Sequence, residues 1–344
     1  MPAESLLPAT LGVLLFLVPA LALFFGGIPD RPTAVALVLG LLASFLVAAL
    51  EWVLLGSALD VALFQAALSA AGAAVVLSVA LRSARRAVAV VAGLLLVLLV
   101  SVPLGFAVFD LVRGPIVVTL GTLDFAGVVV LALVPGSLAV AVLIVGRSWR
   151  QVGGGATRRP TALFPFVAVA AVVGCISASL GAQLLFDDLA GVLVLNGIVA
   201  ALAGAVGWTI TQVINVHRAS WAGAVAGVLA GSIVILPASP WLNTVSVVVL
   251  ALLAGILGHV SAVAVRRGSA GVWATVIGVC LVPGTLGMIG SGIVATGAGL
   301  LFSGHIDLLQ AQAGGLLVVL LYATVVSLVL AYAVRRLGRP RLAE

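Results

Sequence analysis

The side chains in this sequence that can do acid, base, nucleophilic or metal chemistry are few and far apart. The chain of 344 residues has 10 acidic residues, 3 histidines and 2 cysteines. His217, His259 and His305 fall in three different segments, and Cys175 and Cys280 lie in separate apolar stretches. This spacing offers no metal site, no disulfide framework and no nucleophile beside a base. The sequence therefore predicts a protein that is not an enzyme and has no cofactor.

One short pattern occurs twice in apolar surroundings. The sequence reads "LVPGS" at 133–137 and "LVPGT" at 281–285. Pro and Gly both disfavour the interior of a helix. The repeat is either a chance outcome in a chain rich in Leu, Val and Gly, or it marks matching positions in two duplicated halves. Pro135 and Pro283 then either kink two equivalent helices and reshape the space between them, or are kinks that a packed bundle tolerates.

The elements that carry these residues are predicted to be membrane helices. The chain is 64% hydrophobic and 8% charged, whereas a soluble domain has about 25% charged residues. Eleven apolar stretches approach the roughly 20 residues that a bilayer requires. They lie at 6–26, 33–56, 61–81, 87–109, 124–146, 162–184, 189–214, 220–237, 242–264, 271–301 and 314–334. The pattern predicts an all-α polytopic protein embedded in a lipid bilayer.

The basic residues test the number of stretches. All 16 are Arg, and only Arg113 follows an even-numbered stretch. Basic residues gather on the cytoplasmic side of membrane proteins, so we expect the N-terminus outside and the C-terminus inside. Because these Arg residues serve topology, the basic charge balance does not indicate nucleic-acid binding.

A Gly-rich segment, "RSWRQVGGGATRRP" at 147–160, separates two halves of five stretches each. An odd number of spans in each half means that the second half enters the membrane inverted, a plan common in transporters. We therefore expect a single membrane domain over 1–344. It consists of a first repeat at 5–146, a cytoplasmic linker at 147–161, an inverted second repeat at 162–302, and a final helix with a short basic tail at 303–344.

Glu51 lies in the outer half of the second apolar stretch, directly after "LVAAL". A carboxylate within a membrane is costly and is a functional candidate by default. Under that interpretation it is protonated, faces a vestibule or pairs across a subunit interface. Under the alternative, it lies near enough to the outer surface to be hydrated.

Several longer motifs occur in a characteristic order. They are "LALFFGGIPDRP" at 21–32, "EWVLLGSALDV" at 51–61, "GTLDFAGV" at 121–128, "VLNGIVAALAGAVGW" at 194–208 and "VIGVCLVPGTLGMIGSGIVA" at 276–295. With them the chain resembles the ammonium-transporter and Rhesus-glycoprotein (Amt/Rh) family over nearly its whole length. The resemblance implies eleven helices, a homotrimer in the cell membrane and one narrow pore in each subunit.

The pore centre of that family holds two histidines, one in span 5 and one in span 10. The corresponding positions here are Ala132 and Cys280, and each is followed at once by "LVPG". Neither side chain can pass a proton as a histidine does, because Ala has no polar atom and Cys is a weak donor and acceptor. Proton-coupled ammonium transport by the usual mechanism of the family is therefore not expected.

The resemblance also places an aromatic box and a hydroxyl at the outer entrance of the pore. The positions that correspond to this outer vestibule are Leu68, Phe109, Ala178 and Ala182, so one ring of the box remains. Asp124 is retained from the family pattern. It is either a carboxylate near this recruitment site or the N-cap of the fifth span, since Asp accepts hydrogen bonds from the free N–H groups of a helix.

Two functions follow from these residues. The first is a channel that passes a small neutral solute, ammonia by family default. The second is a non-conducting scaffold or partner subunit of a membrane complex. Relatives often carry a long tail that receives a regulatory protein, and with "VRRLGRPRLAE" after the last span we do not expect such a partner.

Overall fold

The computed structural model describes residues 6–82, 84–145, 161–183, 188–266 and 271–337, and within them the regular elements are all helical. Nine helices in these ranges are long and apolar enough to cross a membrane, and two shorter apolar helices, Val129–Val145 and Trp221–Val234, accompany them. Each of the eleven predicted stretches overlaps one of these helices, with ends that differ by up to seven residues, as at the start of the last helix, Asp307 instead of 314. The predicted all-α membrane fold is thus confirmed, while the predicted linker at 147–161 lies outside the described residues except for Thr161.

The first half of the chain holds these elements: α1 (Leu6–Gly12), η1 (Val13–Leu17), α2 (Val18–Gly26), α3 (Arg31–Leu54), α4 (Leu59–Ala80), α5 (Arg86–Leu96), η2 (Val97–Ser101), α6 (Val102–Phe109), α7 (Pro115–Leu120), η3 (Val129–Leu133) and α8 (Val134–Val145). The second half holds α9 (Leu163–Gln183), α10 (Asp188–Val216), α11 (Trp221–Val234), η5 (Leu236–Trp241), α12 (Thr244–Arg266), α13 (Gly271–Val276), η6 (Ile277–Leu281), α14 (Val282–Val294), α15 (Leu300–Ser303) and α16 (Asp307–Leu337).

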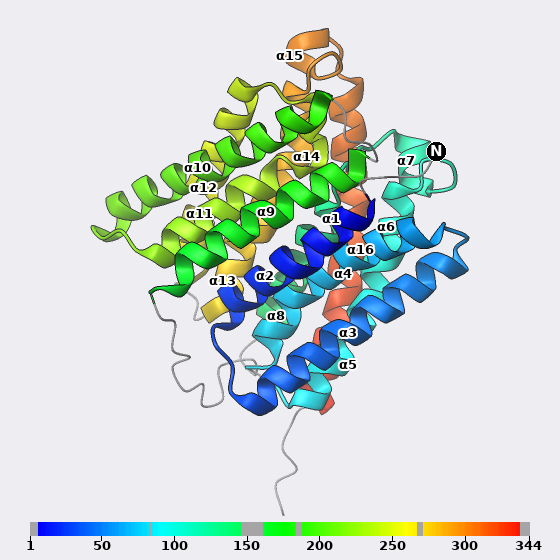
Figure 1. The fold of residues 1–344 in the computed structure, drawn as a ribbon, viewed down its shortest axis with the longest axis vertical. Coiled ribbons are helices and arrows are strands. Elements are labelled where there is room, and N and C mark those ends of the chain that lie inside the picture. The colour runs from blue at the N-terminus through cyan, green and yellow to red at the C-terminus, as the bar shows by residue number, and fades with distance from the viewer. Residues whose placement is uncertain (1–5, 83, 146–160, 184–187, 267–270, 338–344) are drawn as a thin grey trace, which may run out of the picture.

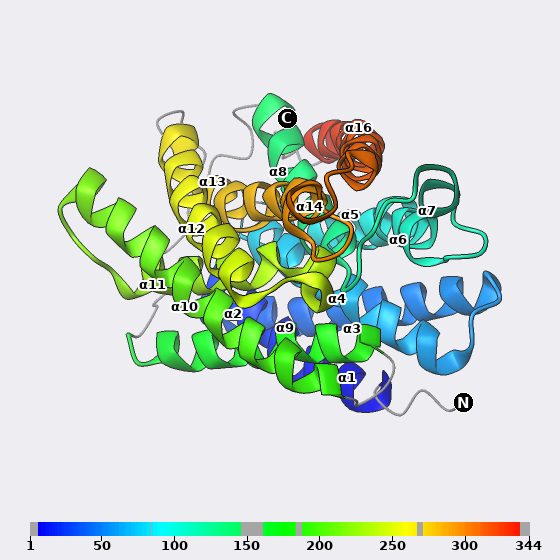
Figure 2. The ribbon, with the colours of Figure 1, turned by 90° about the horizontal axis from the view of Figure 1, so that it is seen from above.

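The helices form one bundle, in which α10 packs along α11 and α12, and α16 packs along α8 (Figure 1). Seen from above, α14 is enclosed by other helices (Figure 2). Burial differs strongly between elements, because the most apolar window of α4 is 89% buried and that of α3 only 17%. The α4 sequence "AALSAAGAAVVLSVA" consists mostly of small residues, which allow neighbouring backbones to approach closely in a membrane protein.

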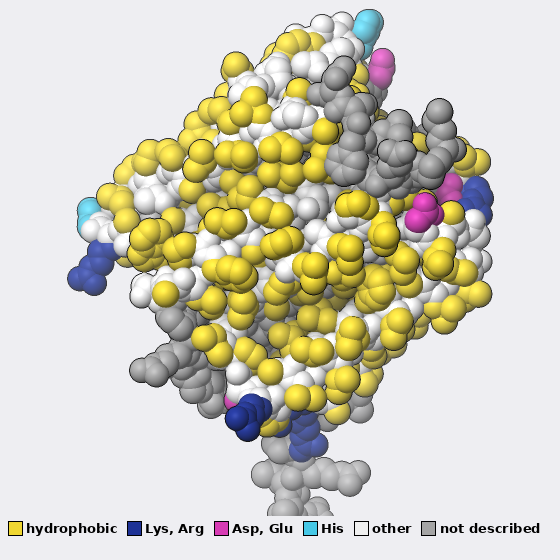
Figure 3. All heavy atoms as spheres, in the orientation of Figure 1, with side chains coloured by type: hydrophobic (Ala, Val, Ile, Leu, Met, Phe, Trp, Pro, Cys, Tyr) yellow, Lys and Arg dark blue, Asp and Glu magenta, His cyan; other side chains and the backbone are white. Residues whose placement is uncertain are grey.

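The outer surface is apolar where lipid would contact it. Hydrophobic side chains cover the middle of the face in Figure 3, and the Arg side chains lie at its margins. The α3 helix alone exposes Val35, Val38, Leu39, Leu42 and Leu46. An exposed apolar surface of this extent is stable only against lipid or another apolar partner.

Four of the apolar helices share one irregularity. In each, a five-residue π-helical segment is followed directly by Val and Pro. The Val N–H donates to a carbonyl five residues earlier, as from Val134 to Val129 and from Val282 to Ile277. The Pro that follows has no N–H, and its ring would clash with the carbonyl four residues before it. The wider π turn moves that carbonyl away, so the expected kinks at Pro135 and Pro283 take the form of π segments.

Neighbouring helices contact carbonyl oxygens that lie shortly before two of these Pro residues. The Tyr322 hydroxyl of α16 donates to the Leu99 carbonyl, four residues before Pro103, at 2.7 Å. Gly72 of α4 lies so close to the Val130 carbonyl oxygen in η3 that an added Cβ would overlap it. The irregular turns of the kinked helices are therefore places where these helices contact their neighbours.

Three Arg side chains donate hydrogen bonds to carbonyl oxygens at the C-terminal ends of helices. Arg82 donates to the Phe25 carbonyl at 3.2 Å, Arg113 donates to the Leu55 carbonyl at 2.7 Å, and Arg335 donates to the Val145 carbonyl at 2.7 Å. The last carbonyls of a helix lack intrahelical donors, and positive charge is favourable there. These residues consequently have a structural use that the charge pattern alone did not indicate.

Candidate functional site

Ala132 and Cys280 occupy the same position in two matching segments. Each is the fourth residue of a five-residue π segment, Ala132 in η3 and Cys280 in η6. Both side chains are fully buried, with 0% exposure. From residue 129 to 137 and from 277 to 285 no side chain is an acid or a base except the weakly acidic thiol of Cys280. The centre between these segments is therefore apolar and has no group that can accept a proton from a solute.

The two "LVPG" segments contact one another directly and reciprocally. A Cβ built on Gly136 would lie 2.6 Å from Cβ of Leu281, so the Leu of the second segment rests on the Gly of the first. A Cβ built on Gly284 would lie 2.9 Å from Cδ2 of Leu133 and 3.5 Å from Cβ of Ala132. Each Leu thus occupies the space that the missing side chain of the other segment's Gly leaves free.

Asp124 lies immediately before the first of these segments and binds its backbone. Its two carboxylate oxygens accept hydrogen bonds from the N–H groups of Val128 and Val129, each at 2.8 Å. The side chain is 6% exposed. This is the geometry of a helix cap, in which a carboxylate satisfies the free N–H groups of the first turn. The helix accordingly begins at Val129 rather than at residue 124, where the predicted span begins.

The loop that carries Asp124 is held from two other helices. The N–H of Phe125 donates to the Pro237 carbonyl at 3.0 Å, and the Phe125 ring meets Trp241 edge-on at 5.5 Å. Gln312 of α16 clamps the preceding residue, Leu123, by donating to its carbonyl and accepting from its N–H, both at 3.0 Å. The loop is therefore fixed in position relative to η5 and α16.

Two of the predicted vestibule positions meet at Gly127, which has a φ of +81°. A Cβ on Gly127 would lie 2.8 Å from Cδ1 of Leu68 and 2.9 Å from Cζ of Phe109. Leu68 is fully buried and Phe109 is partly buried, so both close over the loop before η3. The geometry thus joins Leu68, Phe109 and the loop of Asp124.

The other two predicted vestibule positions, Ala178 and Ala182, lie on α9. Ala178 is fully buried and Ala182 is partly buried. Gly181 between them packs so closely on the Phe64 ring of α4 that an added Cβ would overlap it. This part of α9 is therefore occupied by helix packing.

The place where the two "LVPG" segments contact each other is called the crossing below. Glu51 lies on α3, away from this crossing. One of its carboxylate oxygens, Oε2, is buried and has no hydrogen-bond partner among the described residues. The neighbouring Trp52 is 3% exposed and meets the ring of Phe106 at 6.4 Å between ring centroids. The structure does not bring Glu51 together with Ala132 or Cys280.

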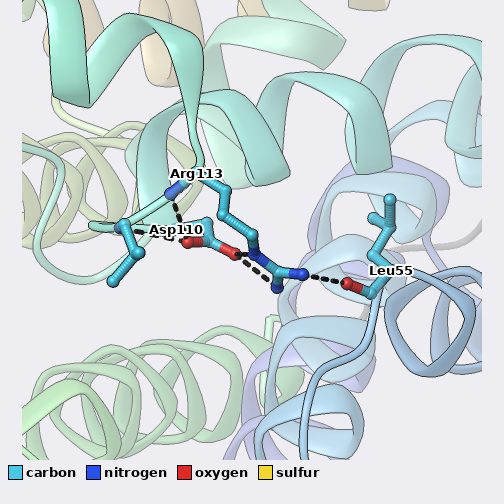
Figure 4. Close-up of polar contacts among 4 residues, drawn as sticks. Leu55, Asp110 and Arg113 are labelled. Atoms are coloured by element: carbon cyan, nitrogen blue, oxygen red, sulfur yellow. Dashed lines mark hydrogen bonds and ion pairs between the residues drawn. The ribbon is translucent and has the colours of Figure 1, made fainter.

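Beyond the end of α3, a second acidic group is tied to the helix terminus. Asp110 forms an ion pair with Arg113 at 2.7 Å, and the Arg113 guanidinium also donates to the Leu55 carbonyl (Figure 4). Burial of the Asp110 carboxyl raises its pKa, but hydrogen bonds from Arg113 and Val112 lower it more, so the pKa lies below its ordinary value of 3.8. Asp110, Arg113 and Leu55 together link the α6–α7 loop to α3.

Because of this link, the free energy of unfolding should depend on pH in the acid range. A carboxyl with a lowered pKa stabilises the fold above the unfolded-state pKa, and the contribution is lost as the pH falls through the folded-state pKa. We expect Asp110→Asn to remove this loss, which amounts to at most about 1 kcal/mol because Arg113 is largely solvated. The measurement is the melting temperature in detergent across the acid range. Identical pH profiles for the wild type and the variant would contradict the role given to Asp110.

Apolar helices that are long enough to cross a membrane define this chain as a polytopic helical membrane protein. The model of the Ammonium Transporter Family matches residues 57–343. The chain belongs to the ammonium transporter family.

Known proteins show the same relationship. The chain is 26% identical over 235 residues to ammonium transporters of Mycobacterium tuberculosis (strain ATCC 25618 / H37Rv) and Mycobacterium bovis. This match covers 62% of the chain and 47% of each relative, so it spans about half the length of these relatives.

Solved structures share the fold. Mep2 of Candida albicans superposes with a TM-score of 0.84 at 17% identity, covering 100% of this chain and 86% of that one. Mep2 of Saccharomyces cerevisiae gives 0.80 at 19% identity, with 96% and 86% covered. A sensor Amt protein gives 0.82 at 18% identity, with 100% and 95% covered.

Sequence reasoning identified the positions of the crossing but not the residues that fill it. It singled out Ala132 and Cys280, whereas Leu133 and Leu281 make the reciprocal contacts with the two Gly residues. The signal was present in the repeat, since a large and a small residue three positions apart in both copies can interlock. The sequence does not show that the two copies face one another, so this interlocking of Leu and Gly could not be predicted from it.

Proposed function

We propose that this protein is a channel of the ammonium transporter family that passes a small neutral solute, ammonia by family default, without coupling to protons. The observation that carries the proposal is the apolar centre. Ala132 and Cys280, which the resemblance to the family places at the positions of its paired histidines, are buried, and no side chain in either segment is a base. An unpaired cation there loses its hydration without compensation, at a cost of several kcal/mol.

The proposal includes the finer points of architecture. The chain crosses the plasma membrane eleven times, with the N-terminus outside and the C-terminus inside, and spans 1–5 and 6–10 are inverted repeats. Support for the repeats comes from the matching places of Ala132 and Cys280 within π segments of equal length. Three subunits assemble, as the resemblance to the family implies, and each has its own path.

A neutral solute with N–H donors would find little to bind within the path. Ser137 lies one turn beyond Leu133 and is 1% exposed, and its hydroxyl oxygen has no hydrogen-bond partner in the part of the chain that is described. A hydroxyl can donate and accept, so Ser137 is suited to a weak, transient contact. Weak contacts favour passage, since conduction requires that a solute also leaves.

Flux through reconstituted protein tests the proposal. In liposomes loaded with a pH-sensitive dye, an ammonium pulse should raise the internal pH faster than in protein-free liposomes, because ammonia enters and takes up a proton. The same vesicles should give no ammonium-induced current. A current comparable to that of a relative with both histidines would contradict the neutral mechanism.

The second candidate is a non-conducting subunit that retains the fold as a scaffold. It is favoured by the direct packing of the two "LVPG" segments, which leaves Ala132 and Cys280 without exposed surface. The same experiment separates the two candidates. An internal pH rise no faster than in protein-free liposomes would favour the scaffold.

A further inference from the structure

We infer that Leu133 and Leu281 form a hydrophobic gate at the crossing of the two "LVPG" segments and determine what passes the centre of the protein. The inference rests on the proposed channel, because it names the residues that close its path. Each Leu is seated on the Gly of the opposite segment, Leu133 on Gly284 and Leu281 on Gly136. Both Leu side chains must move away from the opposite Gly before a continuous path can form between η3 and η6.

The closed crossing excludes water. Ala132, Leu133 and Cys280 each have 0% exposure, and Leu281 is partly buried. Apolar constrictions block ions by remaining dry, since an ion entering them loses its hydration shell. A small neutral molecule loses far less on entry. The two Leu side chains thus select by polarity as well as by size.

The backbone around the two Leu residues is built to move. Each Leu is the last residue of a π segment, and the Pro two positions later cannot donate a helical hydrogen bond. Such segments are the usual places where membrane helices bend. A small change of bend at η3 or η6 would withdraw a Leu from the opposite Gly without breaking the straight parts of α8 and α14.

Cys280 is a natural reporter of this movement. The protein has 2 cysteines, so Cys175→Ala leaves a single thiol beside the gate. A methanethiosulfonate reagent reacts with thiolate that water can reach. We expect Cys280 to react slowly in this background and about tenfold faster when Leu133→Ala is added, because labelling follows the population of the open form. Labelling is measured by the mass of the intact protein.

Three further variants test whether the labelling of Cys280 depends specifically on the contact between Leu133 and Gly284. Leu138→Ala removes the same atoms from a buried position in α8 outside the crossing and should leave the labelling rate unchanged. Gly284→Ala places a methyl group against Leu133 and should raise the rate. Combining Gly284→Ala with Leu133→Ala should bring the rate back toward that of the background, because the added methyl group occupies the vacated space. Such a recovery would show that the contact between positions 133 and 284 limits the access of water to Cys280.

The outcomes for the gate and for the channel are distinct. Equal labelling of Cys280 in the background and in the Leu133→Ala variant, with both proteins folded by their melting transitions, would overturn the gate. So would faster labelling in the combined variant than in Leu133→Ala alone. Faster labelling of Leu133→Ala without any ammonia flux would retain the gate as a property of the protein and reject the proposed channel.

Discussion

Gly72→Ala is expected to destabilise the protein by about 3 kcal/mol or more, at the upper end of overpacking effects. A Cβ at this position would overlap the carbonyl oxygen of Val130, and the next nearest atom is the carbonyl carbon of the same residue at 3.4 Å. The obstacle is backbone, which cannot rotate away as the end of a flexible side chain does. Helix α4 and segment η3 must therefore separate, which also disturbs the crossing of the "LVPG" segments.

The matched control for this prediction is Gly191→Ala in α10. A Cβ added there meets nothing within 4 Å. Since Ala is the better helix former, this variant should be neutral or more stable by up to about 1 kcal/mol. Unfolding of both variants is measured in mixed micelles with increasing denaturing detergent. Similar stabilities for the Gly72 and Gly191 variants would show that α4 and η3 are not packed as described.

Asp124→Ala is expected to destabilise the protein by roughly 2–6 kcal/mol, because two buried N–H groups each lose a partner at a cost of about 1–3 kcal/mol. The groups affected are the N–H groups of Val128 and Val129, which bond separate carboxylate oxygens. Asp124→Asn retains one acceptor oxygen and should cost clearly less. The measurement is again unfolding in mixed micelles.

The two Asp124 variants also decide between the two interpretations of this residue. If Asp124 acts as the cap, the losses of stability should rank Ala above Asn, and ammonia flux per folded protein should change little in the Asn variant. A recruitment carboxylate predicts the reverse pattern. Near-native stability of Asp124→Ala together with abolished flux would contradict the capping role.

Some features could be predicted from local sequence because lipid imposes them. With no water in the bilayer core, each apolar stretch must satisfy its own backbone groups and so becomes a helix. That constraint acts on each stretch separately, which is why the predicted stretches overlap the observed helices. The helix ends depend on local contacts instead, and before α8 Asp124 turns the chain at 124–128 and delays the helix to Val129.

The candidate site could be predicted only in part for the same reason. The pattern "LVPG" identified two positions as counterparts, and the Pro residues indicated an irregular backbone there. Neither feature shows that the helix bends through a π segment, because this depends on whether a neighbour such as Gly72 leaves room for the displaced backbone. The neighbour lies many residues away in the chain.

The sequence by itself determined the class of this protein: a helical membrane protein with a repeated motif and with no catalytic group in that motif. Only the tertiary structure decided that the motifs contact each other, with Leu133 on Gly284 and Leu281 on Gly136. The physical reason is that hydropathy is a property of each segment, whereas helix pairing within a membrane depends on the fit of small and large side chains from distant segments.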